Sequence, residues 1–549
     1  MNRRKFLQFL AALGCSPWLM SPVKQRDARQ FGQVTLMHFT DCHAQLLPMY
    51  YREPSLIVGT GAAKQLPPYL AGQAMLDFFG IAKGSADAYA LSSVNFAEAA
   101  RVFGKMGGFA HLSTLVKQIR EARGHENTLL LDGGDTWQGS ATALWTQGAD
   151  MVAACNLLGV EVMTGHWEFT YGDQRVQALC RAFKGDFVAQ NIRLTEEAQF
   201  AAGIDSDQVF KPYVIKRCGQ ARIAVIGQAF PYTPIANPRR FVPDWRFGIE
   251  EVHLQALVDG IRQRKEAGVI VLLAHNGMAV DLQLAARVTG IDVILGGHSH
   301  DALPRPVVVK NAAGSTWVTN AGSHGKFLAV LDLDIANGRL QNLRYQLQPI
   351  FANLLPPDAA MQQLITDIRQ PYLEKLRQPL AVTEQLLYRR DTYHGSFDGS
   401  LLAALLAVND AEIALSPGFR WGGSLLPGDV IHYEDVLNQT AITYPNSYVR
   451  LMSGRDLQAL LEDVADNVFN QDPYYQQGGD MVRVGGISYR CQPEAAMGRR
   501  ISELRWPDGS LLAADKLYKV AGWAGVGEPL AGLPMDELVC RYLRQGRLS

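Results

Sequence analysis

The sequence predicts an α/β sandwich that is followed by a second, smaller domain. Short apolar runs rich in β-branched residues or leucine recur in the first part of the chain, as expected for fully buried strands. These runs lie within residues 34–40, 127–135, 221–228, 269–275 and 291–300. Helical patterns fall between the runs, for example at 111–123 and 252–268. This alternation of strand and helix is typical of a sheet covered by helices.

The pattern changes beyond residue 350, which marks a domain boundary. A stretch rich in Leu, Gln and Pro at 355–384 is predicted to be a linker helix. After it, 398–416 reads as a long apolar helix followed by a strand, and mixed short strands continue to the end. We therefore predict a first domain at 32–354 and a second at 385–549. Residues 45–104 interrupt the first domain and are predicted to be an insertion and a candidate lid.

Composition excludes several classes of protein before any motif is considered. The 549 residues are enough for two or three domains, and 48% apolar with 19% charged residues is typical of a packed globular protein. Lys plus Arg total 52 and Asp plus Glu total 53, a net charge of −1 that gives no support to nucleic-acid binding. No apolar run reaches the roughly 18 to 20 residues of a membrane-spanning helix, so no stable membrane insertion is expected.

The N-terminus has the layout of an export signal. Arg3 and Arg4 precede an apolar stretch at 6–13, and the pair followed by Lys-Phe-Leu resembles a twin-arginine signal. We predict an export signal at 1–31 and a periplasmic mature protein; a basic amphipathic first helix is the alternative. No clean cleavage site is visible, and Cys15 leaves lipidation open.

The seven cysteines are widely spaced and form no C-x-x-C pair, so neither a zinc ribbon nor a thioredoxin-like site is predicted. Disulfides in an exported protein and buried free thiols both remain open.

Polar clusters directly follow the predicted strands, where α/β folds place their sites. The clusters are Asp41-Cys42-His43, Gly134-Asp135, Gly165-His166-Trp167-Glu168, Ala274-His275-Asn276 and Gly297-His298-Ser299-His300. Any one of these histidines alone would be read as a core or surface residue. Together, imidazole nitrogens and carboxylate oxygens suit a pair of divalent ions such as Mn, Zn or Fe. One carboxylate can bridge two such ions, and the pair can activate water as a nucleophile.

The ordered set D-x-H at 41–43, G-D at 134–135, A-H at 274–275 and G-H-x-H at 297–300 resembles the calcineurin-like metallophosphoesterases, specifically the 5′-nucleotidase superfamily. The resemblance implies a four-layer sandwich that carries the catalytic metals within 32–354, and a C-terminal α+β domain that binds substrate. It assigns the first metal to Asp41, His43, Asp135 and His300. It makes Asp135 the bridge and gives His275 and His298 to the second metal.

One departure from the family pattern concerns the catalytic dyad. The family motif is G-N-H-E-F-D-Y-G, whereas residues 165–172 read GHWEFTYG. His166 replaces a metal-binding Asn and can still ligate, Trp167 replaces the catalytic His, and Thr170 replaces its Asp partner. Either phosphatase activity is lost, or the substrate has a leaving group that needs little protonation. A thiolate or persulfide is such a group, because its pKa lies far below that of an alcohol.

A second departure concerns the site that holds the nucleotide base. Tyr444 and Asn446 keep an aromatic residue and the Asn of one base-binding segment of the family. Residues 520–527 lack the expected Phe and the Asp of the other segment, which disfavours a nucleoside. Arg420 matches the family's anion-binding Arg, whose planar guanidinium suits phosphate or sulfonate. Asp173 is a candidate replacement for the missing Asp and a substrate-binding residue, with a helix N-cap as the alternative reading.

Both departures, together with the segments at 41–55, 274–278, 296–304 and 477–486, resemble the thiosulfohydrolases of the sulfur-oxidation (Sox) system. The resemblance implies a periplasmic hydrolase with two manganese ions per chain, in preference to zinc or iron. It implies release of sulfate from a cysteine S-thiosulfonate on the SoxYZ carrier protein, with Asp135, His166 and Arg420 as catalytic residues. A periplasmic 5′-nucleotidase or phosphoesterase, and a metal-dependent binding protein without catalysis, are the alternatives.

Overall fold

A computed structural model describes residues 33–546. The predicted export signal at 1–31 therefore lies outside the described residues.

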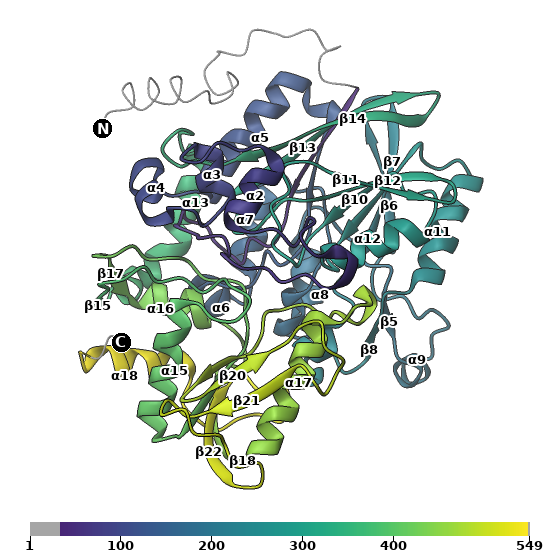
Figure 1. The fold of residues 1–549 in the computed structure, drawn as a ribbon. Helices are drawn as coiled ribbons and strands as arrows, with labels where there is room; N and C mark the ends of the chain where they lie inside the picture. The colour runs from purple at the N-terminus through teal and green to yellow at the C-terminus, as the bar shows by residue number, and fades with distance from the viewer. Residues whose placement is uncertain (1–32, 547–549) are drawn as a thin grey trace.

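Within residues 33–546, two six-stranded sheets lie face to face in the upper domain of Figure 1. The first has the order β14-β13-β1-β2-β3-β4, and the second has the order β11-β12-β10-β9-β7-β6. The first comprises β1 (Val34–Phe39), β2 (Thr128–Asp132), β3 (Val162–Met163), β4 (Asp186–Phe187), β13 (Phe327–Ala336) and β14 (Arg339–Pro349). The second comprises β6 (Tyr213–Cys218), β7 (Ala221–Gln228), β9 (Val269–Ala274), β10 (Val293–Gly296), β11 (Val307–Asn311) and β12 (Gly314–Asn320).

Side chains on alternate positions of the central strands build separate cores on the two faces of each sheet. In β9, Val271 and Leu273 pack between the sheets, whereas Ile270 and Leu272 pack against helices on the outer face. Helices α11 (Glu251–Gln263) and α12 (Met278–Arg287) cover that outer face. Helices α5 (Phe109–Arg123), α7 (Ala149–Leu158), α8 (Asp173–Ala182) and α13 (Ala359–Arg369) cover the first sheet. The predicted four-layer α/β sandwich is confirmed.

The insertion between β1 and α5 folds as short helices that pack at the domain boundary. It contains α2 (Gly72–Phe79), α3 (Ala86–Leu91) and α4 (Phe96–Phe103). Tyr89, Phe96 and Phe103 form one apolar cluster with Phe351 of the first domain and Leu426 of the second. The insertion therefore has core contacts on both sides of the boundary.

The segment 355–384 is not one continuous helix. It contains α13, a 3-10 turn at Gln370–Tyr372, α14 (Leu373–Leu376) and β15 (Pro379–Val382). Pro371 lies at the start of this turn, where its missing N–H interrupts the helical hydrogen-bond pattern.

The second domain is an α+β unit built around a sheet with the order β18-β22-β16-β19. Its strands are β16 (Ile413–Ser416), β18 (Ser447–Ser453), β19 (Arg483–Gly485) and β22 (Leu517–Trp523), with pairs β15/β17 (Val430–His432) and β20 (Ser488–Cys491)/β21 (Ile501–Arg505). Its helices are α15 (Ser396–Asn409), α16 (Tyr433–Thr440), α17 (Gly454–Phe469) and α18 (Met535–Arg544). The predicted C-terminal α+β domain of 5′-nucleotidase type is confirmed.

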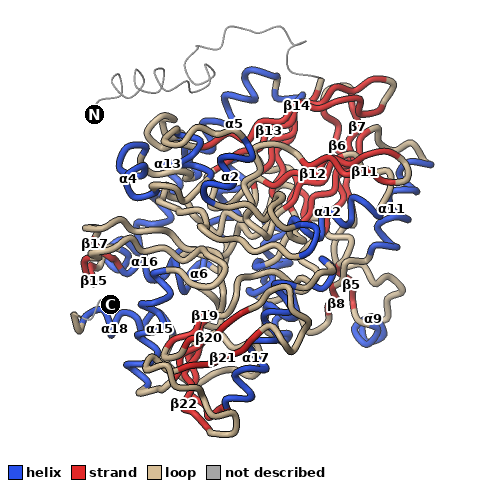
Figure 2. The backbone as a smooth tube through the Cα atoms, viewed as in Figure 1, coloured by secondary structure: helices blue, strands red, loops and turns tan. Residues whose placement is uncertain are grey.

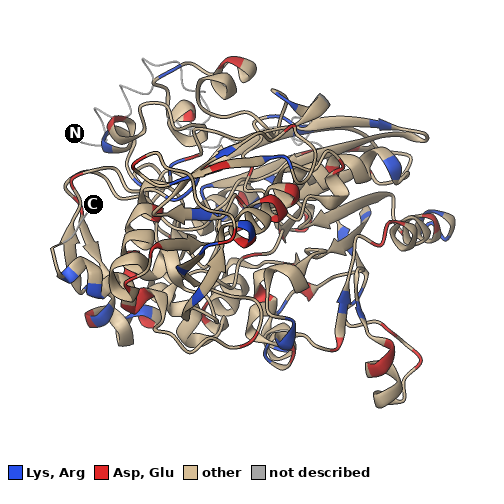
Figure 3. Ribbon diagram, turned by 60° about the horizontal axis from the view of Figure 1, so that its bottom comes forward, with Lys and Arg blue, Asp and Glu red and all other residues tan. Residues whose placement is uncertain are grey.

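Smaller elements and loops complete the chain. They include α6 (Ala141–Thr146), α10 (Thr233–Ala236), and the pair β5 (Ile192–Leu194)/β8 (Trp245–Phe247) with α9 (Glu196–Ala202) between them. Long loops fill much of the space between the first domain's strands and the second domain (Figure 2). Basic and acidic residues are interspersed over the molecule (Figure 3). Among the described helices, none is both long and apolar enough to cross a membrane.

The cysteines of the described residues are all free thiols. Burial is the main cause that raises their pKa values, to about 12 for Cys180, Cys218 and Cys540. The pKa values of Cys42 and Cys155 are raised well above the ordinary range by burial and nearby carboxylates.

Candidate metal centre

Seven polar side chains converge where the carboxyl ends of the parallel strands meet. They are Asp41 and His43 after β1, Asp135 after β2, His166 after β3, His275 after β9, and His298 and His300 after β10. All are buried, and His298 is the most exposed at 9%. Left-handed φ angles occur at Asp41, His43, Asp135, His298 and His300. Such angles are costly for residues other than glycine and concentrate at functional sites.

One cluster is formed by Asp41, His43, Asp135 and His300, whose candidate ligand atoms all lie within 4.8 Å of one another. His43 Nε2 is 3.0 Å from His300 Nε2. His300 Nε2 is 3.2 Å from Asp41 Oδ1, and His43 Nε2 is 3.8 Å from Asp135 Oδ2. This is the set that the family resemblance assigns to the first metal.

The other cluster is formed by Asp135, His166, His275 and His298, again within 4.8 Å. Asp135 Oδ2 lies 3.2 Å from His166 Nδ1 and 3.1 Å from His275 Nε2. Because Asp135 is shared by both clusters, its carboxylate is placed to bridge two ions.

The donor set fits a pair of divalent cations. His298 Nε2 is buried and has no hydrogen-bond partner among the described residues, and the buried His275 Nε2 has close to it only carboxylates that are themselves candidate ligands, with Asp135 Oδ2 at 3.1 Å. Buried polar atoms without partners are rare in folded proteins, and a bound cation would satisfy both nitrogens. His275 Nδ1 lies 2.6 Å from the carbonyl of Gly133 and donates to it in the tautomer that leaves Nε2 free to ligate. The structure thus contains a candidate dinuclear metal site of nitrogen and oxygen ligands.

Electrostatics favour the ligating forms of His298, His300 and Asp135. For His275, burial lowers the pKa but the Asp135 and Asp41 carboxylates raise it, to about 10, and burial raises the pKa of Asp41. Burial, His166 and Arg420 lower the pKa of His298 well below its usual value, and burial and His43 do the same for His300. Burial alone would raise the pKa of Asp135, but His166 and His275 lower it well below its usual range. Neutral imidazoles and an ionised bridging carboxylate are the forms that bind metal.

A buried carboxylate that was not predicted as a site residue organises the loops beneath the ligands. Glu168 is fully buried and accepts backbone N–H groups from Thr136 at 2.8 Å, Trp137 at 3.1 Å and His166 at 2.8 Å. Its signal in the sequence is an acidic residue within an otherwise apolar motif. The carboxylate ties the loop after β2 to the loop after β3, which carry Asp135 and His166.

Trp167 lines a cavity beside the metal clusters, and its indole ring contributes no acid–base group. Its backbone N–H donates to Asp135 Oδ1 at 2.7 Å, which fixes the bridging carboxylate. Its ring packs edge-on against Trp421 and Phe419, with ring centroids 4.9 and 5.4 Å away. Thr170 forms a hydrogen bond with the hydroxyl of Thr443 in the second domain. The His–Asp dyad of the family motif is therefore replaced by an aromatic wall and a contact between domains.

A cavity of about 410 Å³ opens from the metal clusters toward the second domain. Ligand residues line one end, and Trp167, Phe419, Trp421, Tyr444 and Trp523 line its walls. Tyr444 was predicted from its motif, whereas Phe419, Trp421 and Trp523 of the second domain were missed, because loops far apart in sequence bring them together. A mostly apolar cavity that ends at polar groups is typical of a ligand site.

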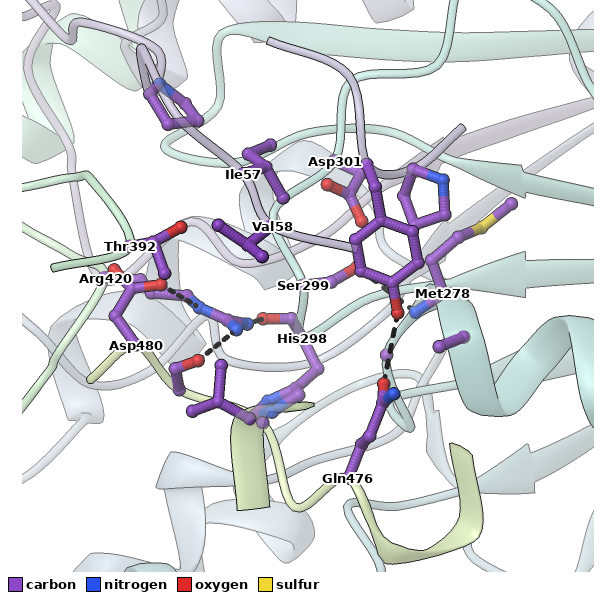
Figure 4. Close-up of a pocket in the computed structure, with 18 of the residues that line it drawn as sticks. Ile57, Val58, Met278, His298, Ser299, Asp301, Thr392, Arg420, Gln476 and Asp480 are labelled. Carbon is purple, nitrogen blue, oxygen red and sulfur yellow. Dashed lines mark hydrogen bonds and ion pairs between the residues drawn. The ribbon is translucent and has the colours of Figure 1, made fainter. Parts of the chain in front are cut away.

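Arg420 lies at the edge of this cavity and bonds to the loops around it. Its guanidinium donates to the carbonyls of His298 at 3.1 Å and Gly479 at 2.6 Å, and it pairs with Asp480 at 3.4 Å. Figure 4 shows Arg420 between His298 and Asp480. The same residues border a smaller cavity of about 90 Å³ that reaches Ile57 of the insertion and Met278 of α12.

The other predicted substrate residues divide into two groups. Tyr444 lines the large cavity, and its hydroxyl donates to Ala236 O at 2.9 Å. Asn446 and Asp173 are not among the lining residues of that cavity. The amide of Asn446 donates to Gly532 O at 2.9 Å, and the carboxylate of Asp173, the first residue of α8, accepts the N–H of Gln174 at 2.6 Å. Both side chains therefore bond to backbone groups, Asp173 within its own helix and Asn446 to a loop 86 positions along the chain.

Comparisons with known proteins agree with this geometry. A family profile described as "5′-nucleotidase, C-terminal domain" matches residues 361–535. The solved structure of sulfate thiohydrolase SoxB from Thermus thermophilus, in complex with glycerol, superposes with a TM-score of 0.87 at 37% sequence identity. The match covers 96% of this chain and 95% of that one. The chain belongs to the SoxB family. This SoxB-family chain also shares its fold with a 5′-nucleotidase precursor from Thermus thermophilus, with a TM-score of 0.73 at 22% identity, covering 93% of this chain and 96% of that one.

Sequence relatives place the SoxB family within a wider group of hydrolases. Human 5′-nucleotidase is 27% identical over 451 residues, which cover 76% of each chain. The trifunctional nucleotide phosphoesterase of Bacillus subtilis is 26% identical over 455 residues, which cover 75% of this chain but only 30% of that longer protein. Fold, family and ligand clusters make the SoxB-family chain a metal-dependent hydrolase of the 5′-nucleotidase superfamily.

Proposed function

We propose that this chain releases sulfate from a cysteine S-thiosulfonate carried by the SoxYZ protein, using two manganese ions. One observation carries the proposal. The ligand clusters of a hydrolytic metal pair are complete, while the imidazole that would protonate an alkoxide is replaced by Trp167. Similarity to the SoxB sulfate thiohydrolase supports the same substrate class.

The reaction breaks one sulfur–sulfur bond. When bound, the metal pair lowers the pKa of a water molecule and so supplies hydroxide at neutral pH. The oxygen of that nucleophile bonds to the terminal sulfone sulfur, the S–S bond breaks, and its electron pair leaves with the persulfide on the carrier cysteine. The products are sulfate, the carrier persulfide and two protons. Because a persulfide is a stable anion near neutral pH, no general acid is required.

The chain's own residues bind and orient the substrate in this proposal. Asp135 and His166 would hold the metals, and Arg420 would supply positive charge to the sulfonate. The aromatic walls at Trp421 and Trp523 accept the apolar stem of an extended carrier arm. Tyr444 keeps one half of the family's base-binding pair, but residues 520–527 lack the Phe and the Asp of the other half, which disfavours a nucleoside.

We further propose that the protein works in the periplasm after export by the twin-arginine route. The support is the basic pair Arg3-Arg4 and the apolar stretch at 6–13. That route carries folded proteins, which suits a metal centre assembled before export.

The deciding experiment combines manganese-loaded protein with carrier whose thiosulfonate load is verified by mass spectrometry. We expect one sulfate per carrier, measured by ion chromatography, and a carrier mass that matches the persulfide. Asp135→Asn is the inactive control, and zinc- and iron-loaded protein compare the metals. Absence of sulfate release from verified carrier would overturn the proposal.

A 5′-nucleotidase activity is the second candidate, because the metal ligands and Tyr444 are retained. Turnover of AMP at roughly 1–1,000 s⁻¹, a normal enzymatic rate, would favour it. We expect AMP turnover far below sulfate release when both are measured on the same preparation.

A further inference from the structure

One segment of the insertion, residues 50–60, runs along the second domain; we call it the strap. The purple chain of the insertion passes between the two domains in Figure 1. Tyr50 forms an antiparallel bridge with Ser424, whose N–H donates to Tyr50 O at 2.7 Å. The N–H of Arg52 donates to Ser424 Oγ at 3.0 Å. The strap is therefore joined to the second domain through its backbone.

Asp391 of the second domain is the main anchor of the strap. This carboxylate is 7% exposed and accepts Ser55 Oγ at 2.5 Å and Leu56 N–H at 2.9 Å. It also pairs with Arg52 Nη1 at 3.7 Å. Further along, Thr392 Oγ1 donates to Leu56 O at 2.8 Å. A single buried side chain therefore receives three contacts from the strap.

The strap is fixed equally well to the first domain. Lys326, which follows β12, is 1% exposed, and its ammonium donates to Tyr51 O at 3.4 Å and Ala90 O at 3.0 Å. It also forms an ion pair with Glu53. Buried charges are costly unless paired, so this network fixes the strap firmly.

Tyr51 contacts His324, which packs beside two metal-ligand histidines, and also the backbone of Arg420. Its ring stacks on His324 with centroids 4.0 Å apart. His324 lies in turn 5.6 Å from the ring of His43 and 5.7 Å from that of His300. The hydroxyl of Tyr51 donates to Arg420 O at 3.1 Å. The side chain of Tyr51 therefore connects the backbone of Arg420, through His324, to the two metal ligands His43 and His300.

Domains of one chain move relative to each other unless their interface is large and apolar. The strap adds buried hydrogen bonds and ion pairs across this boundary, beside the shared apolar cluster around Tyr89 and Leu426. We propose that the strap holds the two domains in one orientation and that Tyr51 is a positioning residue for Arg420 over the metal centre. Substrate then reaches the metals by threading through the cavity, not by domain opening.

The test compares two carboxylates of equal burial. Asp391→Ala removes the three strap contacts, whereas Asp332→Ala removes a network inside the first domain. Asp332 is also 7% exposed and accepts Thr35 Oγ1 at 2.6 Å and Arg123 Nε at 2.9 Å. In metal-loaded full-length protein, we expect Asp391→Ala to speed amide exchange at Ser424 at least tenfold and to enlarge the particle in small-angle scattering. Asp332→Ala should change neither.

Tyr51 variants separate positioning from simple packing. Tyr51→Phe keeps the ring on His324 but loses the bond to Arg420 O, so exchange near Arg420 should rise while metal content is retained. Tyr51→Leu should also reduce metal content. These readouts need no substrate, so they stand whichever reaction the protein catalyses. Equal exchange and scattering in Asp391→Ala, Asp332→Ala and the parent protein, or Tyr51→Phe indistinguishable from the parent protein, would overturn the proposal.

Discussion

Trp167 lies where the 5′-nucleotidase motif places its catalytic histidine. It belongs to a 3-10 turn at Trp167–Tyr171, and residues three apart in such a turn point the same way. Trp167 and Thr170 therefore hold the relative positions that a His–Asp dyad would need. At this turn, Trp167 and Thr170 are the two side chains that depart from the dyad of the family motif.

We predict that the double variant Trp167→His/Thr170→Asp gains phosphatase activity. A positioned general acid contributes about 10²–10⁴-fold to rate, so kcat/KM for glycerol 2-phosphate, an ester with an alkoxide leaving group, should rise at least about tenfold. Trp167→Phe keeps an aromatic wall without an acid and should gain nothing. Equal phosphate release by both variants would show that the dyad does not limit this reaction.

Asp281 of α12 illustrates a buried carboxyl whose charge is costly. Burial raises its pKa to about 7, an increase that the amide of Asn276, donating at 2.9 Å, only partly offsets. Its other oxygen has no hydrogen-bond partner among the described residues. The folded protein therefore holds this proton more tightly than the unfolded chain does.

The sign of the pH dependence follows from this difference in proton binding. Since the folded pKa is above the ordinary value of 3.8, unfolding releases a proton between that pH and about 7. The contribution of Asp281 to stability falls as pH rises through this window and is constant above it. We expect the difference in melting temperature, Asp281→Asn minus the parent protein, to increase from pH 4 to about 7 and then to stay constant. Calorimetry on metal-free samples measures this difference. A difference that is constant with pH would contradict the assignment.

At the scale of elements, buried parallel strands were the most predictable part of the molecule. Their apolar runs place the ends of β1, β2, β9 and β10, and the polar residues that follow them converge in the structure. The contacts of Tyr51 with His324 and Arg420 were not predictable, since they join residues more than 270 positions apart. Asn446 and Asp173 were predicted as substrate residues from their motif positions, but a motif position does not reveal that a side chain already bonds to a backbone group.

The loop before β19 lies close to His298 of the candidate metal centre, and substitutions in the loop can test this contact. Gly478 and Gly479 both have left-handed φ angles, 77° and 84°. A Cβ atom on Gly478 would overlap His298 Nε2, whereas one on Gly479 would meet only Gly418 O at 3.9 Å. Both alanine variants therefore carry similar backbone strain, but only one displaces a metal ligand.

We predict that Gly478→Ala loses about one of the two metals by elemental analysis, together with most activity. Gly479→Ala should keep both metals and lose only stability, on the order of 1–2 kcal/mol from the strained angle. Equal metal content in the two variants would mean that the loop can move away without disturbing His298.

At the scale of the molecule, the metal centre joins the two sheets. Asp41, Asp135 and His166 follow strands of the first sheet, and His275, His298 and His300 follow strands of the second. An ion held by both sets links the layers and binds only the folded chain.

Removing metal should therefore lower the melting temperature by several degrees. Ligand binding at about a thousand times its Kd stabilises a fold by on the order of 4 kcal/mol. Scanning calorimetry with and without chelator measures the shift, and adding back manganese should restore it. Asp135→Asn is the control: its melting temperature should not respond to chelator.

The state of the thiols has a chemical consequence for the whole protein. Thiosulfonates and persulfides transfer sulfur to thiolates, and a thiol with a high pKa is rarely a thiolate. Cys42 lies between two ligands of the metal centre, yet it is fully buried and its pKa is raised well above the ordinary range. The other cysteines of the described chain are likewise free and shifted in the same direction. Under the proposed function, the cysteines of the described residues would therefore compete poorly for the activated sulfur of the substrate.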